Sequence, residues 1–332
     1  MKVLVTGAAG FIGYHISHRL LSDGYSVVGV DNFDPYYDVD LKKWRLDRIE
    51  EVSDPQRWRF VNADICDGKS LGEVFDSDQF DYVVNMAARP GARHSYNVPE
   101  SYFKSNVTGF FNVLEQCRIH NVRHLVFASS SSVYGCSQNE LLSTDDRTDS
   151  PVSVYAATKK ADEILASSYS AMFGLKSTGL RFFTVYGPAG RPDMAYYKFT
   201  DTLVNGGSIQ LFNSGLCRRD FTYVGDIAEA VARVLSVNRE NSCSVYNIGS
   251  GSPCGMLEFA TLLARKLSLA GLLPSGFDLS RHIEKLPMQN GDVLHTHADT
   301  SSFERDFGFV PGTGLDQGLG RFVEWYKEYN NN

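Results

Sequence analysis

The sequence has no apolar stretch long enough to cross a membrane, no basic run and no low-complexity tract. A membrane-spanning helix needs roughly 20 consecutive apolar residues, whereas the apolar run at the N-terminus is broken by glycines and followed by polar residues. The net charge of −7 gives no electrostatic footprint for nucleic acid or for a membrane surface. We therefore expect a cytoplasmic protein that binds neither nucleic acid nor membrane.

Cysteine and histidine patterns typical of metal sites are also missing. The six cysteines are scattered, with no CxxC motif and no metal-ligand spacing, so reduced thiols explain them best. Of the eight histidines only His295 and His297 resemble a ligand pair, and they lack further partners. We predict no metal site, and we expect the two histidines on a surface strand.

The sequence does contain short apolar runs that alternate with helical patterns. We predict strands at residues 2–6, 26–31, 58–63, 81–87, 124–128 and 178–183, and helices at 11–22, at 100–120 and around Tyr155. Continuous apolar strands separated by helices are typical of a parallel sheet covered on both faces. The fold class that follows is α/β, with a Rossmann doubly wound parallel sheet.

The alternation loosens after Tyr186, where Gly, Pro and aromatic residues become frequent. We predict a dinucleotide-binding domain at residues 1–186, to which residues 221–251 return. Residues 187–220 and 252–332 are then expected to form a smaller mixed C-terminal lobe that binds the substrate.

A glycine-rich turn lies between the first predicted strand and the first predicted helix. Gly7, Gly10 and Gly13 allow a tight turn and close approach of the backbone to a pyrophosphate, and the helix N-terminus adds free N–H groups. Asp31 ends the second strand 18 residues after Gly13, where a carboxylate accepts hydrogen bonds from ribose hydroxyls and repels the extra phosphate of NADP. We predict NAD as cofactor, with Phe11, Ile12 and Asn32 beside it. A plain glycine turn with an N-capping aspartate is the alternative.

Tyr155 and Lys159 stand four residues apart in SVYAATKKADEIL, which puts both side chains on one face of a helix. Such a pair is either a catalytic tyrosine with its activating lysine or two ordinary neighbours. A run of hydroxyls, Ser129 to Ser132, ends the fifth strand at the edge where open α/β sheets bind ligands.

Serine, tyrosine and lysine after a Rossmann half resemble the extended short-chain dehydrogenase/reductase family, and the resemblance runs through nearly the whole chain. It implies that Tyr155 is the general acid/base, that Lys159 lowers its pKa and binds the nicotinamide ribose, and that a serine holds the substrate hydroxyl. Ser130 matches best, and the four-serine run leaves Ser131 and Ser132 open. A phenol titrates near 10 in isolation, and a neighbouring positive charge lowers that pKa.

Three further stretches resemble the nucleotide-sugar epimerases and, within them, the UDP-glucuronate 4-epimerases: residues 179–199, 218–230 and 288–299. Thr184 stands where the galactose epimerases usually carry Asn, and Gln289 where they carry Arg. Ser131 and Ser132 replace the carboxylic acids of related decarboxylases and dehydratases. The resemblance implies 4-epimerisation of UDP-glucuronate through a 4-keto sugar, with NAD regenerated in each turn and therefore retained.

The same resemblance implies roles for further residues. Arg191 and Thr184 are expected to hold the substrate carboxylate, Arg219 the pyrophosphate, Phe212 the uracil and Asp292 a hydroxyl of the substrate. A surface cation, a strand-edge salt bridge and a core phenylalanine are the ordinary alternatives for Arg191, Arg219 and Phe212. On the cofactor side we expect Asp64 and Ile65 beside adenine, Ala87 and Ala88 along the cofactor backbone, and Asn106 anchoring the loop near the serines.

The family also pairs the helices expected at 100–120 and 154–173 between subunits, so a homodimer is expected. Two alternative activities remain at this level, a 4-epimerase of neutral UDP-hexoses and a UDP-glucuronate decarboxylase. An NAD-binding regulatory protein without catalysis is the third alternative. The intact serine, tyrosine and lysine set argues against it, because binding alone requires neither the phenol nor the lysine.

Overall fold

A seven-stranded parallel sheet forms the centre of the computed structural model, which describes residues 1–237, 243–288 and 292–331. Its strand order is β3-β2-β1-β4-β5-β6-β10. The bounds are β1 Lys2–Thr6, β2 Ser26–Asp31, β3 Trp58–Asn62, β4 Tyr82–Asn85, β5 His124–Ser130, β6 Ser177–Phe182 and β10 Cys243–Ile248. The predicted doubly wound α/β fold is confirmed.

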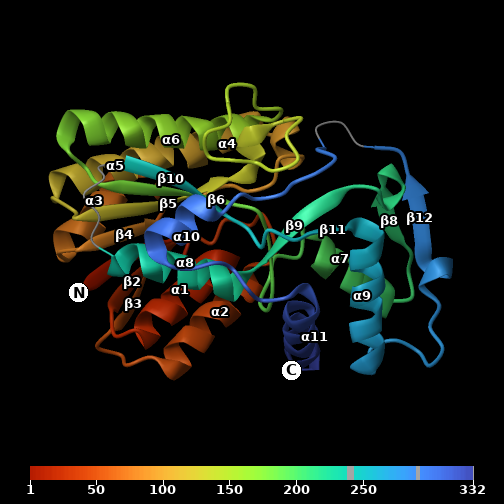
Figure 1. The fold of residues 1–332 in the computed structure, drawn as a ribbon. Helices are drawn as coiled ribbons and strands as arrows, with labels where there is room; N and C mark the ends of the chain where they lie inside the picture. The colour runs from red at the N-terminus through yellow and green to blue at the C-terminus, as the bar shows by residue number, and fades with distance from the viewer. Residues whose placement is uncertain (238–242, 289–291, 332) are drawn as a thin grey trace.

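Helices cover both faces of this sheet (Figure 1). One layer contains α3 (Gly68–Ser77), α5 (Gly109–Ile119) and α6 (Val154–Phe173), and the other contains α1 (Phe11–Ser22), α2 (Val39–Val52) and α8 (Val224–Ser236). The helix predicted at 100–120 is three consecutive segments: α4 (Pro99–Tyr102), a π-helical segment η2 (Phe103–Thr108) and α5. The π-helical turn is the feature that periodicity alone did not predict.

The strand order reverses between β1 and β4, because β2 and β3 continue to one side of β1 and β5, β6 and β10 to the other. Loops leaving the carboxyl ends of β1 and β4 therefore diverge and open a crevice. Ligands of open α/β sheets bind at this point of reversal. The glycine turn after β1 and the 86–92 segment after β4 form its two walls.

Most of the remaining elements form smaller sheets and a group of helices beside the main sheet (Figure 1). One sheet has the order β11-β9-β7 and the other pairs β12 with β8. The bounds are β7 Thr184–Tyr186, β8 Ile209–Phe212, β9 Arg218–Tyr223, β11 Pro253–Gly255, β12 Ile283–Leu286, α7 Ala195–Val204, α9 Met256–Leu269, α10 Ser301–Phe307 and α11 Leu315–Asn331. Contacts cross the predicted domain boundaries: β7 of the predicted first domain pairs with β9, and α10 of the predicted second lobe packs on β10 of the main sheet. The two-domain division therefore stays a prediction.

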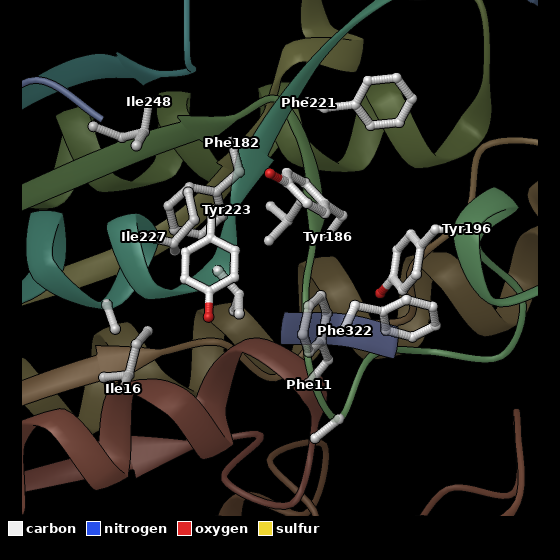
Figure 2. Packing of buried hydrophobic residues seen from close by; sticks show 14 of the residues in the cluster. Phe11, Ile16, Phe182, Tyr186, Tyr196, Phe221, Tyr223, Ile227, Ile248 and Phe322 are labelled. Carbon is white, nitrogen blue, oxygen red and sulfur yellow. The ribbon is translucent and has the colours of Figure 1, made fainter. Parts of the chain in front are cut away.

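One apolar cluster joins the main sheet to these smaller elements. Figure 2 shows Phe11 and Ile16 of α1 and Ile248 of β10 in the same cluster as Tyr186, Phe221 and Phe322. The phenyl rings of Phe221 and Phe259 stack with centroids 4.3 Å apart. Aromatic packing of this kind stabilises beyond the area it buries, so the two parts of the chain share a continuous core.

Four features expected from composition concern membrane spans, cysteines, metal ligands and the pair His295 and His297. None of the helices in the described residues combines the length and apolarity that a membrane span requires, and all six cysteines are unpaired. Within the same residues no three ligand-type side chains converge as they would around a metal ion. His295 forms an isolated β-bridge with Arg218 rather than a strand, and the His295 and His297 rings each contact a backbone carbonyl.

Candidate functional site

Close backbone contacts explain the glycines after β1. Gly7 has φ +69°, and a Cβ there would lie 2.7 Å from the Ala87 backbone nitrogen. A Cβ on Gly13 would lie 2.1 Å from the Gly7 carbonyl oxygen. Side chains are excluded at both positions, while α1 begins at Phe11 with no side-chain cap on Gly10. The first N–H groups of α1 are thus left for a ligand in the crevice.

Asp31 lies where a ribose would be bound, at the end of β2 in the wall of the same cavity. It is buried, accepts a hydrogen bond from the Phe33 backbone N–H at 2.8 Å, and lies 3.5 Å from the Lys42 ammonium. The side-chain oxygen of Asn32 accepts a hydrogen bond from the Asp34 backbone N–H at 2.9 Å. A free carboxylate edge at this point fits a dinucleotide without a 2′-phosphate.

The other residues expected near a dinucleotide lie around the same cavity, with one exception. The cavity is lined by Gly7, Gly10, Phe11, Ile12, Gly13, Asp31, Asn32, Asp64, Ile65, Ala87 and Ala88. Crowded glycines, an uncapped helix N-terminus and a carboxylate at the end of β2 fit NAD. This chain would hold the pyrophosphate at Gly10 to Gly13 and the adenosine ribose at Asp31.

Asn106 is the exception, because it lies behind the cavity wall rather than in it. Its carbonyl oxygen accepts from the Arg89 N–H at 2.7 Å, and its amide donates to the Arg89 carbonyl at 3.1 Å and to Thr158 Oγ1 at 2.9 Å. Asn106 sits in the π-helical segment η2, a geometry frequent at functional sites. It therefore ties the 86–92 segment to α6 and supports the cavity from outside.

The four serines after β5 have different surroundings. Ser129 is buried and donates to Glu163 Oε1 at 2.6 Å, and Glu163 also binds Arg181. Ser130 Oγ accepts from the Ser132 N–H at 3.1 Å and so begins the 3₁₀ turn η3 (Ser131–Tyr134). All four serines line the cavity. The Ser129 hydroxyl is committed to the core, and those of Ser130, Ser131 and Ser132 are the candidates for substrate.

Tyr155 lies in the first turn of α6, which Ser153 caps by accepting from the Ala156 N–H at 3.1 Å. One turn later Lys159 donates to the Ala128 carbonyl at 3.0 Å and to Asp162 Oδ2 at 3.1 Å. The Tyr155 ring meets the Tyr102 ring edge-on, with centroids 6.3 Å apart. Both Tyr155 and Lys159 line the cavity that the glycine turn and the serines also line.

Arg191 and Thr184 line the same cavity. Arg191 pairs with Asp193 through Nε at 2.9 Å and one terminal nitrogen at 2.8 Å, and Tyr36 donates to Asp193 Oδ2 at 3.2 Å. A guanidinium has five N–H donors. The Asp193 pair uses two of them, and the same terminal nitrogen also donates to Met194 Sδ, a weak acceptor, at 3.5 Å. The second terminal nitrogen remains for a ligand. Burial by itself would lower the pKa of Arg191, but the neighbouring Asp193 carboxylate outweighs this effect and raises the pKa above its ordinary value.

The residues expected at the uridine end lie apart from this cavity lining. Phe212 and Asp292 meet at Arg93, whose guanidinium lies 5.0 Å from the Phe212 ring centroid and 2.6 Å from Asp292 Oδ2. Arg219 donates to the Arg218 carbonyl at 3.0 Å. Gln289 lies outside the described residues. The structure thus groups Phe212 with Asp292 and leaves Arg219 bonded to backbone.

Sequence reasoning missed several side chains that shape the site: Tyr36, Lys42, Arg45, Asp162 and Asp193. Arg45 is fully buried and donates to the carbonyls of Ala9, Ala189 and Gly190, so it joins the glycine turn to the segment before Arg191. Asp162 could have been found from the sequence, since it follows Lys159 by three residues on one helix face. Asp193 likewise follows Arg191 in the motif RPD. No local sequence pattern indicated the structural role of Arg45.

Known proteins resemble this chain over almost its full length. A family described as NAD dependent epimerase/dehydratase matches residues 3–249. Protein CapI of Staphylococcus aureus is 42% identical over 99% of both chains. UDP-glucuronate 4-epimerase 3 of Arabidopsis thaliana is 43% identical over 99% of this chain and 77% of that protein.

A solved structure of a related enzyme has the same fold. The UDP-glucuronic acid 4-epimerase of Bacillus cereus, in complex with UDP-glucuronic acid and NAD, superposes with a TM-score of 0.90 at 30% identity, covering 99% of this chain and 100% of that one. The likeness includes the cofactor half and the smaller sheets alike. By sequence and by fold, this chain belongs to the NAD-dependent epimerase/dehydratase family.

Proposed function

We propose that this chain is a UDP-glucuronate 4-epimerase that interconverts UDP-glucuronic acid and UDP-galacturonic acid with tightly bound NAD. The observation that carries the proposal is the shared cavity: the glycine turn, the serines, Tyr155, Lys159 and Arg191 all line it. Relatives named for this activity match 99% of the chain.

The chemistry we assign to this chain is proton transfer at the sugar 4-hydroxyl. NAD, when bound, would accept the hydride from C4 of the sugar and return it. Tyr155 removes the hydroxyl proton and returns it to the same oxygen after the 4-keto sugar has turned over, so that the hydride comes back to the opposite face of C4. The Lys159 ammonium stabilises the phenolate, and Ser130 orients the hydroxyl, with Ser131 and Ser132 as alternatives.

Arg191 is the residue we assign to the substrate carboxylate. Its Nε and one terminal nitrogen are already bound to Asp193, which holds the guanidinium in one orientation. A second carboxylate binds at the other terminal nitrogen and displaces the weak contact to Met194 Sδ. Planar guanidinium and carboxylate groups pair bidentately. Thr184 in the same cavity adds a hydroxyl. We further assign Phe212, Asp292 and Arg219 to the uridine diphosphate, which requires Asp292 to release Arg93.

Decarboxylation is the competing outcome for a 4-keto glucuronate, which is a β-keto acid. Ser131 and Ser132 line the cavity where a decarboxylase or dehydratase would carry a carboxylic acid. A firmly held substrate carboxylate and the lack of that acid both favour return of the hydride. This supports epimerisation over loss of carbon dioxide.

The test is proton NMR of the purified protein incubated with UDP-glucuronic acid and no added NAD. We expect UDP-galacturonic acid signals to grow, because NAD is regenerated in every cycle and copurifies. In the Tyr155→Phe variant the rate should fall by about 10²- to 10⁴-fold, the usual contribution of a general acid/base, while the NAD content is unchanged.

Other spectra would overturn the proposal. UDP-xylose signals would identify a decarboxylase, and turnover of UDP-glucose alone would identify an epimerase of neutral hexoses. If no nucleotide sugar changes although NAD is bound, the chain is a binding protein. A Tyr155→Phe variant with nearly the wild-type rate would remove Tyr155 from the mechanism.

We also propose that the protein is a cytoplasmic homodimer formed through α5 and α6. These helices lie side by side on one face of the molecule (Figure 1). They and the preceding η2 expose large apolar side chains: Phe103, Phe111, Ile164, Met172 and Phe173. Exposed apolar side chains gathered on neighbouring helices support an interface with a second copy.

A further inference from the structure

Asp162 is a buried carboxyl group in contact with the lysine of the active site. The Asp162 and Lys159 side chains are 1% and 3% exposed, and Oδ2 accepts from the ammonium at 3.1 Å. The ammonium also donates to the Ala128 carbonyl at 3.0 Å. Since a lysine has three N–H donors, two are committed and one is left for the cavity that Lys159 lines.

The second carboxyl oxygen of Asp162 is unusual. Among the described residues Oδ1 has no hydrogen-bond partner although it is buried. The adjacent Glu163 differs, because Ser129 and Arg181 bind its Oε1 and Arg181 also binds its Oε2. A buried carboxylate with an unpaired oxygen is costly. The hydrogen bonds of Asp162 therefore satisfy it less completely than those of its neighbour satisfy Glu163.

We propose that Asp162 is a positioning residue for the epimerase: it fixes the Lys159 ammonium and sets how much of its positive charge acts on Tyr155. This inference rests on the proposed function, in which Tyr155 is the acid/base. An ionised carboxylate beside the ammonium opposes its field, so the phenolate is less stabilised. A protonated carboxyl keeps the contact without opposing the charge.

The surroundings allow this carboxyl to change its charge near neutral pH. Burial raises the pKa of Asp162 to about 7, although Lys159 opposes the rise, and Glu163 is the other charge that acts on it. The elements packed on α6 present further titratable groups: Arg181 of β6, Tyr134 of η3, Cys243 of β10, Tyr102 of α4 and Glu115 of α5. Arg181 is held by Glu163, which leaves Lys159 as the cationic partner of Asp162.

The test is an ultraviolet titration of the Tyr155 phenol in the NAD-bound protein, read as the difference from the Tyr155→Phe counterpart. Asp162→Asn keeps the shape and removes the charge. We expect the phenolate to appear at a pH lower by on the order of one unit. The acid limb of the kcat profile with UDP-glucuronic acid should move by the same amount.

Asp162→Ala is the second variant should Asp162→Asn fail to fold, and it should also lower the titration. Glu115→Gln is the control, since it removes a carboxylate from α5 that binds Arg118 and Tyr169, and it should not move the phenol. An unchanged or raised titration in folded Asp162 variants overturns the inference. The titration needs no turnover, so inactivity of the wild type toward UDP-glucuronic acid would defeat the proposed function separately.

Discussion

At the scale of single residues, Asp193 holds the side chain of Arg191, the residue that we propose for the substrate carboxylate. Asp193 binds its Nε edge, and Tyr36 holds Asp193 from a segment 157 residues away in sequence. Such an arrangement fixes a long side chain before the substrate arrives and so reduces the entropy lost on binding. A free surface arginine would lack this preparation.

Replacing Arg191 by alanine should therefore weaken binding of UDP-glucuronic acid selectively. Charge-assisted hydrogen bonds contribute about 1.5–3 kcal/mol, which corresponds to roughly a 10- to 150-fold rise in Kd. Isothermal titration of the Tyr155→Phe background measures this without turnover. UDP-glucose is the comparison ligand because it has no carboxylate, and an equal loss for both sugars would remove Arg191 from the carboxylate site.

At the scale of elements, β5 and β6 are joined below the active site by a buried side-chain contact. His124 at the start of β5 lies 2.8 Å from Thr178 Oγ1 of β6, measured from its Nε2. Burial lowers the pKa of His124 to about 4 from 6.5. The folded protein therefore keeps this imidazole neutral where the unfolded chain binds a proton.

The stability of the folded protein depends on pH through this group because the folded and unfolded states bind different numbers of protons. Between pH 6.5 and pH 4 the unfolded state holds more protons, so stability falls as the pH falls, by roughly 3 kcal/mol at most for this group. His124→Gln should flatten the curve of unfolding free energy against pH in that window, as measured by urea denaturation.

Thr178→Val is the matched variant, because it removes the hydrogen bond and keeps the histidine. It should lower the free energy of unfolding while the pH dependence persists. If His124→Gln retained the full wild-type slope, the neutral buried imidazole would not be its cause.

At the scale of the whole molecule, the cavity lies where the main sheet and the smaller elements share a core. Arg45 bonds the glycine turn to the 189–190 segment, and the aromatic cluster in Figure 2 continues from α1 to α11. The walls that carry Tyr155 and Arg191 are therefore parts of one packed body. The face formed by α5 and α6 is the one that we propose for contact with a second copy.

A charge placed in that face should prevent formation of the proposed dimer. Ile164 on α6 is 56% exposed, and Ile164→Glu would place a charge in an apolar interface. Size-exclusion chromatography with light scattering should give a dimer for the wild type and a monomer for this variant. Leu269→Glu on α9, where the leucine is 77% exposed, is the control and should remain dimeric. A monomeric wild type would contradict the proposed interface.

The sequence by itself determined the features that depend on near neighbours. The strands at β1 and β2, the helix α1, the glycine turn and the Tyr155 to Lys159 spacing all follow from local periodicity or local steric demands, and the predicted bounds of these elements match the structure. The serine cluster at the end of β5 was placed by the rule that parallel strands end at one edge.

Only the tertiary structure decided which side chains meet across the chain. Arg93 contacts Asp292 across 199 residues, and Tyr36 contacts Asp193 across 157. Asp162 was visible as a neighbour of Lys159, but the lack of a partner for its Oδ1 among the described residues was not. Such contacts depend on how distant elements pack, and no short-range pattern carries that information.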